Sequence, residues 1–118
     1  MHAAHFVATI ALLLASPALA AQCSSNKVNG GDTACAQRIA DRMCSQLSCD
    51  GNFDQAEGGV HVQGVMSNGA CPNNCANAVA DILDQCIANR WDSGTWQLCG
   101  EWYWIYSIRN SPAGSAGC

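Results

Sequence analysis

The chain has 118 residues and is acidic, with nine Asp and Glu against five Lys and Arg, so its formal net charge is −4. Binding to nucleic acid or to anionic lipid relies mainly on a cationic surface. We therefore expect neither nucleic-acid binding nor membrane insertion. The length suits one domain with a small core.

The N-terminal segment has the pattern of a secretory signal. Residues 6–20 are apolar and uncharged, and Ala18-Leu19-Ala20 is the small-x-small pattern that signal peptidase accepts. The segment is too short to span a bilayer. We predict a signal peptide over residues 1–20, a single cysteine-rich domain over 21–118 with a flexible tail at 110–118, and secretion to the extracellular space.

Nine cysteines follow this segment, and small secreted domains commonly use disulfides to supplement a small core. They are Cys23, Cys35, Cys44, Cys49, Cys71, Cys75, Cys86, Cys99 and Cys118. Nine cysteines form at most four internal bridges, so one is free or pairs with another chain. Cys118 on the tail and Cys23 near the mature N-terminus are the candidates for the unpaired residue.

Two segments have helical periodicity. The first runs from an Asp32 cap to about Gln46, and the second from about residue 72 to Arg90. Cys35 and Cys44 fall on opposite flanks of the first helix, whereas Cys75 and Cys86 are about three turns apart on the second. Neither pair can close on itself, so each helix must be tied to other elements.

The remaining chain predicts strands and turns. Residues 50–59 read as a loop, residues 60–65 as a strand with Gly64 as a candidate bulge, and residues 102–108 as a second strand. Further short strands are expected within 23–28 and 96–99. The fold class is therefore α+β, with two helices packed on a small, mainly antiparallel sheet and stabilised by disulfides.

Catalytic and metal-binding patterns are sparse. Outside the signal segment His61 is the only histidine, so a Ser-His-Asp triad would depend on it, and we expect His61 to be structural and the protein not to be an enzyme. Cys44 with Cys49, and Cys71 with Cys75, have a spacing that superficially resembles zinc ligands. In an oxidising compartment these thiols form disulfides, so we expect no metal and no cofactor.

Six of the eight aromatic residues lie between Trp91 and Tyr106. Two interpretations stay open for Trp91, Trp96, Trp102 and Trp104. The indole rings supply the bulk of a core that has only two Phe residues, or they form an exposed surface that stacks on sugar rings or contacts a protein.

The cysteine-rich chain resembles the small secreted cysteine-rich effectors of fungi, and more loosely the killer-toxin-like α/β sandwich. The resemblance rests on Cys23-(x5)-Asn29-Gly30-Gly31 and on two helices that each carry a cysteine pair. It implies a non-enzymatic virulence effector that acts in the host apoplast or xylem, where a host immune receptor recognises it. The implied partner is a host protein or a second secreted effector, bound through an intermolecular disulfide.

Two other functions compete with the effector hypothesis. One is a glycan-binding protein that uses the Trp-rich strand, and the other is an antimicrobial killer-type toxin.

Overall fold

The computed structural model describes residues 20–28 and 31–108. The predicted tail, and the predicted signal peptide apart from Ala20, lie outside these residues. Within the described ranges, no helix is long and apolar enough to cross a membrane.

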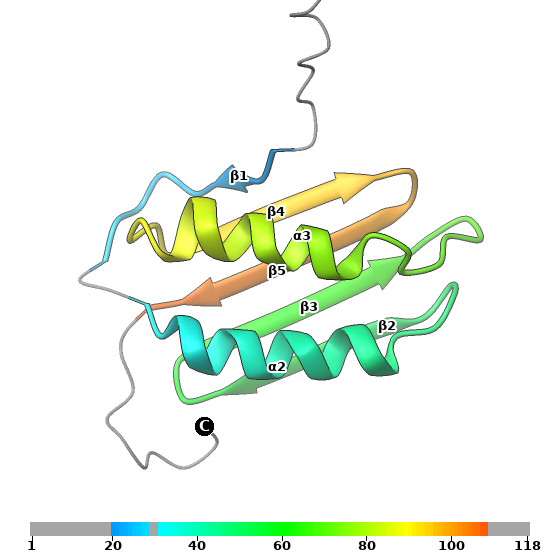
Figure 1. The fold of residues 1–118 in the computed structure, drawn as a ribbon, viewed down its shortest axis with the longest axis horizontal. Helices are drawn as coiled ribbons and strands as arrows, with labels where there is room; N and C mark the ends of the chain where they lie inside the picture. The colour runs from blue at the N-terminus through cyan, green and yellow to red at the C-terminus, as the bar shows by residue number, and fades with distance from the viewer. Residues whose placement is uncertain (1–19, 29–30, 109–118) are drawn as a thin grey trace, which may run out of the picture.

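The molecule has two layers, a five-stranded antiparallel sheet and two helices that lie side by side on one of its faces (Figure 1). The strand order is β1-β4-β5-β3-β2, which places β5 at the centre. The bounds are β1 Gln22–Cys23, α2 Thr33–Gln46, β2 Asn52–Glu57, β3 Val60–Met66, α3 Cys75–Ile82, β4 Ser93–Leu98 and β5 Glu101–Ser107. This arrangement confirms the predicted fold class.

The prediction of a loop over 50–59 is wrong, because strand β2 forms there at the edge of the sheet. β2 joins β3 through a tight turn in which Gly58 and Gly59 have φ values of 56° and 87°. Glycine adopts positive φ without steric cost, and two consecutive glycines are typical of a hairpin turn. The sequence of β2 is polar and does not indicate a strand, because an edge strand of a sheet covered on one face buries only alternate residues.

Helix α2 begins as predicted, where the Asp32 side chain accepts a hydrogen bond from the backbone N–H of Cys35 at 2.8 Å. The second helix departs from the prediction at its far end. It is α-helical only to Ile82, and a π-helical turn, η1 (Leu83–Ile87), follows. There the backbone N–H of Ala88 donates to the carbonyl of Leu83, five residues back, at 2.8 Å.

The start of α3 is anchored on β5 rather than capped by its own Asn74 side chain. The carboxylate of Glu101, which is 5% exposed, accepts from the Asn74 backbone at 2.9 Å and from its side chain at 2.7 Å. The buried Tyr103 hydroxyl donates to the same carboxylate at 2.6 Å. Burial, together with this hydrogen bond, raises the pKa of Tyr103. These contacts fix α3 on the sheet.

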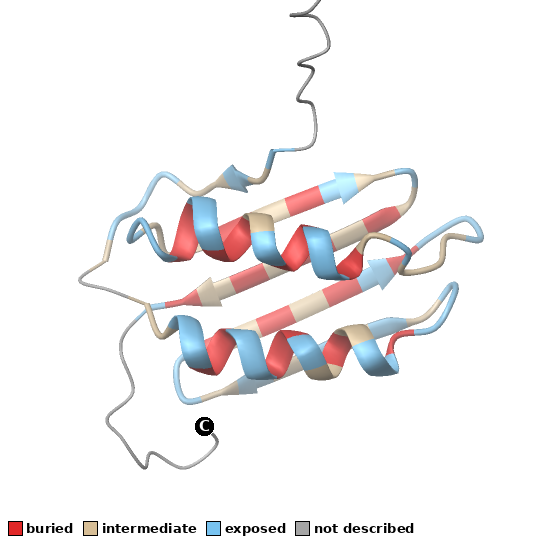
Figure 2. Cartoon of the chain, viewed as in Figure 1, coloured by how far each residue is buried: buried red, intermediate tan, exposed pale blue. Residues whose placement is uncertain are grey.

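The core lies between the helices and the sheet, and buried and less buried residues alternate along β3, β4 and β5 (Figure 2). Its largest fully buried side chains come from both layers: Tyr103, Ile39, Met43, Ile82, Ile87 and Ile105. Gly64 lies in regular register between Phe53 and Tyr103 rather than in a bulge. A Cβ there would lie 2.7 Å from the Met43 Sδ, so glycine lets α2 approach the sheet.

Three disulfides join described cysteines: Cys23–Cys86, Cys44–Cys75 and Cys49–Cys71. The second ties α2 to α3, and the first ties β1 to η1, as expected from the inability of either helical pair to close on itself. The four cysteines with zinc-like spacing are therefore all in bridges. Cys35 is also disulfide-bonded.

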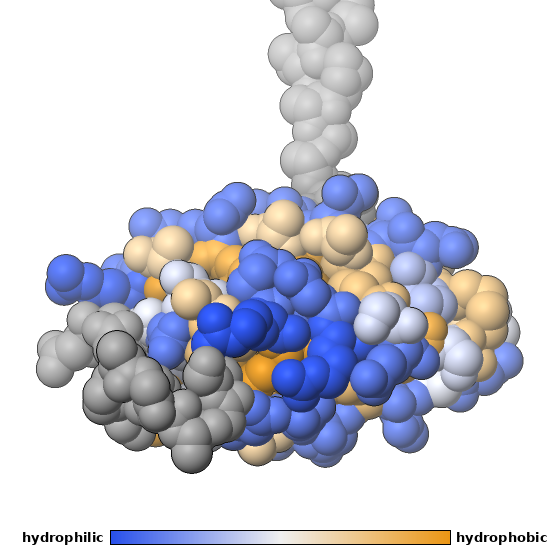
Figure 3. Space-filling model, turned by 60° about the horizontal axis from the view of Figure 1, so that its bottom comes forward, coloured by the Kyte–Doolittle hydropathy of each residue, from blue (hydrophilic) through white to orange (hydrophobic). Residues whose placement is uncertain are grey.

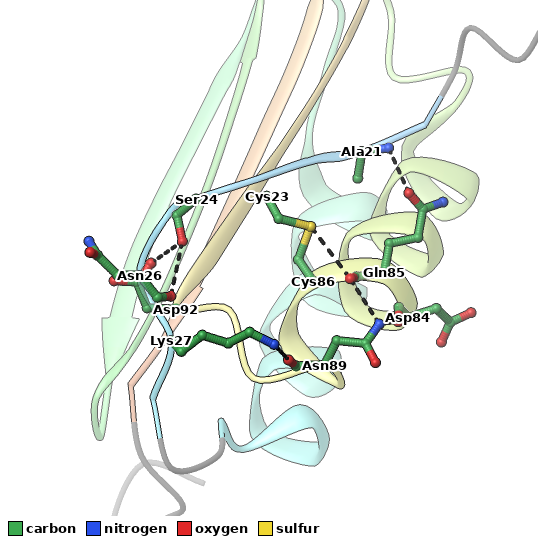
Figure 4. The surroundings of a disulfide bond; sticks show 10 residues. All are labelled: Ala21, Cys23, Ser24, Asn26, Lys27, Asp84, Gln85, Cys86, Asn89 and Asp92. Carbon is green, nitrogen blue, oxygen red and sulfur yellow. Dashed lines mark hydrogen bonds between the residues drawn. A yellow bond between two sulfur atoms is a disulfide. The ribbon is translucent and has the colours of Figure 1, made fainter.

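Hydrogen bonds around Cys23–Cys86 hold the N-terminal segment against η1 and β4 (Figure 4). The Ala21 backbone N–H donates to the Gln85 side chain at 3.1 Å, and Lys27 Nζ donates to the Asn89 carbonyl at 2.8 Å. The Ser24 hydroxyl donates to Asp92. The two-residue strand β1 therefore depends on side-chain contacts as well as on the disulfide.

The unpaired thiol among the described residues is Cys99, which is exposed in the β4–β5 turn. Cys23, one of the two expected candidates, is instead bonded to Cys86, and Cys118 lies outside the described residues. Sequence spacing could not identify Cys99, because bridge formation depends on Cβ atoms from distant elements facing one another.

Replacing both Cys44 and Cys75 with Ala should lower the free energy of unfolding by about 2–4 kcal/mol, because the unfolded chain gains the freedom that this bridge removes. Guanidinium unfolding monitored by circular dichroism measures the change. The matched control, Cys99→Ala, should stay within about 0.5 kcal/mol of the parent, since it breaks no bridge. Equal losses in the two proteins would contradict the assignment.

Gly94→Ala should cost about 1–3 kcal/mol by overpacking. A Cβ at residue 94 would lie 2.6 Å from the Cys86 Sγ, which the bridge to Cys23 holds in place. In a background with both of these cysteines changed to Ala, the Sγ is absent and the same substitution should cost less. A double-mutant cycle from thermal unfolding tests this coupling, and strict additivity would refute it.

Candidate functional site

Both helices cover the same face of the sheet, and the side chains that point away from them form what we call the open face. Successive strand residues point to opposite faces, so burial of alternate residues assigns the others to this face. Its members are His61, Gln63 and Val65 of β3, Ser93, Thr95 and Gln97 of β4, and Trp102, Trp104 and Tyr106 of β5. Among the described large hydrophobic residues, the exposed ones are Val65 on this face and Ile108 just beyond β5.

Trp102, Trp104 and Tyr106 form an aromatic row along the central strand. Residues two apart on a strand are about 6.6–6.8 Å apart. The rings of Trp104 and Tyr106 are nearly parallel, with an interplanar angle of 15° and centroids 5.7 Å apart. All three side chains are partly exposed, so the row presents aromatic surface to solvent.

A polar cluster borders the row on the side of β2 and β3. The Asp54 carboxylate lies 2.6 Å from His61 Nε2 and accepts a hydrogen bond from Gln63 Nε2 at 2.9 Å. The hydrogen bond with His61, and secondarily that with Gln63, holds the pKa of Asp54 below its ordinary value. The His61 ring in turn packs edge-on against Trp104, with centroids 5.1 Å apart. The Asp54 carboxylate, the Gln63 amide and the His61 ring are therefore joined by hydrogen bonds, and the His61 ring connects them to the aromatic row.

The β4 side of the row carries neutral hydrogen-bonding groups. Thr95 lies opposite Trp104, and Gln97 lies opposite Trp102. Two shallow hollows share Gln97. One, of about 410 Å³, reaches Trp102 and the β4–β5 turn, and the other, of about 220 Å³, is lined by Ala20, Gln22, Thr95 and Gln97. The row is therefore flanked by polar groups on both sides.

The structure separates the four tryptophans that the sequence grouped together. Trp102 and Trp104 lie on the open face, whereas Trp96 is 3% exposed, points to the helices and donates from Nε1 to Asp81 at 3.2 Å. Trp91 precedes β4, with Lys27 Nζ 4.3 Å from its ring centroid. Trp96 therefore belongs to the core, whereas Trp102 and Trp104 are partly exposed on the open face.

Sequence reasoning missed Asp54, Gln63, Thr95, Gln97 and Tyr106. The sequence predicts a loop at Asp54, which gives no indication that it pairs with His61. The signal that could have found it is Gly58-Gly59, because a tight turn there sets Asp54 opposite Gln63. His61 itself lies on the polar side of β3, as its alternation with Val60 and Val62 predicts.

No protein-family model and no curated protein matches the chain. A solved structure with a similar fold is the tandem DUF26 ectodomain of the Arabidopsis thaliana cysteine-rich receptor-like protein PDLP8. The TM-score is 0.53 at 15% identity, over 75% of this chain and 44% of that one, so this chain spans less than half of that ectodomain. At this identity the likeness concerns the fold alone.

Several disulfides in a small domain are typical of extracellular proteins. The killer-toxin-like type stays a prediction.

The Asp54 carboxyl should titrate below its ordinary range, and His61→Ala should move its pKa upward, because the largest cause of the shift is removed. The native state prefers the ionised form, so the stabilisation is present above the ordinary carboxyl pKa and is lost as pH falls through the lowered one. NMR titration of side-chain carboxyl carbons measures both proteins. An unchanged midpoint in the variant would show that His61 does not hold this charge.

Proposed function

We propose that the protein is a secreted carbohydrate-binding protein and that its open face binds glycan chains. The observation that carries this proposal is the partly exposed row of Trp102, Trp104 and Tyr106 on the sheet face that neither described helix covers, bordered by amide, hydroxyl and carboxylate groups. Pyranose rings have apolar C–H faces that stack on aromatic rings and hydroxyls at their edges that exchange hydrogen bonds. The open face offers both kinds of contact together.

The rigidity of the row supports the same function. Its residues lie on the central strand, paired on both sides by β3 and β4. The polar neighbours Asp54, His61 and Gln63 already hold one another in place. Side chains that are ordered before binding lose little conformational entropy when a ligand arrives.

The effector hypothesis is compatible with this proposal. The effector hypothesis concerns the source of the protein and the host in which it acts. The glycan-binding proposal concerns the ligand of the open face. Both propose that the protein works by binding and not by catalysis. A protein that binds wall or surface glycans would act in the apoplast without entering a cell.

The test is binding of the secreted protein to a panel of insoluble and soluble polysaccharides. Trp104→Ala should raise the dissociation constant about 30-fold, since truncation of a central aromatic anchor typically costs about 2 kcal/mol. Trp91→Ala is the matched control, because Trp91 precedes β4, lies outside the aromatic row and packs beside Lys27, and it should bind as the parent does. Circular dichroism checks the folding of both variants. Absence of binding to every glycan, or equal loss in both variants, would refute the proposal.

A further inference from the structure

The direction of the aromatic row restricts the shape of the ligand. The row follows one straight strand, and the span from residue 102 to residue 106 is about 13 Å at 3.3 Å per residue. That length is on the order of three pyranose rings in an extended chain. The rings of Trp104 and Tyr106 stack on each other along the strand, so they form one continuous aromatic segment of the row. A helical glycan would curve away from such a row.

The side chains on the two sides of the aromatic row restrict which glycosidic linkage the ligand can have. Hydrogen-bonding side chains lie on both long sides of the row, with Gln63 and Asp54 on one side and Thr95 and Gln97 on the other. A β-1,4-linked chain of sugars with equatorial hydroxyls is a flat ribbon, with its apolar C–H surfaces on the two faces and its hydroxyls along both edges. Laid along the row, such a ribbon sets its apolar face against the exposed parts of the rings and directs its edges to these side chains.

The charges restrict the ligand further. The open-face positions of β3, β4 and β5 carry no Lys or Arg, and the neighbouring Asp54 is held by His61 and Gln63. Arg42, a basic residue of the described part of the chain, lies elsewhere. Arg42 of α2 pairs with Glu57 at 3.1 Å on the helix side, and Figure 3 shows hydrophilic residues gathered on the side of α2 and β2. An anionic sugar would meet a carboxylate without a balancing side-chain cation from Lys or Arg.

We infer that the ligand is a neutral, unbranched β-1,4-linked glycan that lies flat along β5, with one sugar over each of Trp102, Trp104 and Tyr106. This inference rests on the proposed function and names its substrate class. The outer rings of the row add contacts only when the chain is long enough to reach them. Affinity should therefore increase with chain length until the row is filled.

Isothermal titration calorimetry with soluble oligosaccharides tests the inference. The probes are cello- and chito-oligosaccharides of two to six units, maltohexaose as a neutral helical glycan, and hexagalacturonate as an acidic one. In at least one β-1,4 series the affinity should rise from two units and level off at three or four. Maltohexaose and hexagalacturonate should bind at least tenfold more weakly than the hexamer of that series.

Two variants locate the chain on the strand. Tyr106→Ala should remove the gain between two and three units while the affinity for the dimer changes less than twofold. Trp104→Ala should weaken every length. Thr33→Ala, on the helix layer, is the control and should bind as the parent does.

The outcomes separate the inference from the proposed function. Binding that prefers maltohexaose or hexagalacturonate, or that lacks length dependence, would overturn the inference and leave carbohydrate binding standing. No binding by any glycan would overturn both. If size-exclusion chromatography shows a dimer that Trp104→Ala converts to monomer, the open face is an interface between copies and both proposals are wrong.

Discussion

The candidate site depends on the alternation of β5 beneath the two helices. Tyr103 and Ile105 are fully buried against the helix layer, and their neighbours along the strand must point the other way. The three side chains of the aromatic row are exposed because the residues between them on β5 point into the core. A slip of one residue in the register of β5 would exchange the two sets and bury the indoles among the helices.

Two kinds of contact oppose such a slip. Glu101 begins β5 and accepts hydrogen bonds from Asn74 and Tyr103, so the start of α3 and the register of the strand are fixed by one buried carboxylate. The Cys44–Cys75 bridge then holds α2 to α3, which keeps the helix layer as one unit. A buried acceptor that loses its donors costs more than a surface contact, so shifted registers are strongly disfavoured.

The parts predictable from sequence are those that periodicity determines. Asp32 marks the start of α2, and the apolar spacing of both helices gives their buried stripes, because an amphipathic helix repeats its core residues every three or four positions. Strand β2 is harder, since only Phe53 of its side chains is a large apolar residue and the edge position leaves the rest polar. The cluster of Asp54, His61 and Gln63 could not be predicted without strand β2. The pairing of Cys23 with Cys86 could not be predicted without the position of η1 in the fold.

The position of Cys99 determines whether a partner bound through a disulfide and a glycan on the open face would occupy the same surface. Cys99 lies in the β4–β5 turn and lines the hollow that also contains Gln97 and Trp102, at one end of the aromatic row. A disulfide to another chain at this turn would place the partner beyond Trp102, where it leaves Trp104 and Tyr106 uncovered. Because Cys99 and Trp102 line the same hollow, a covalent partner and a glycan would compete at the Trp102 end of the row, while Trp104 and Tyr106 stay available to the glycan.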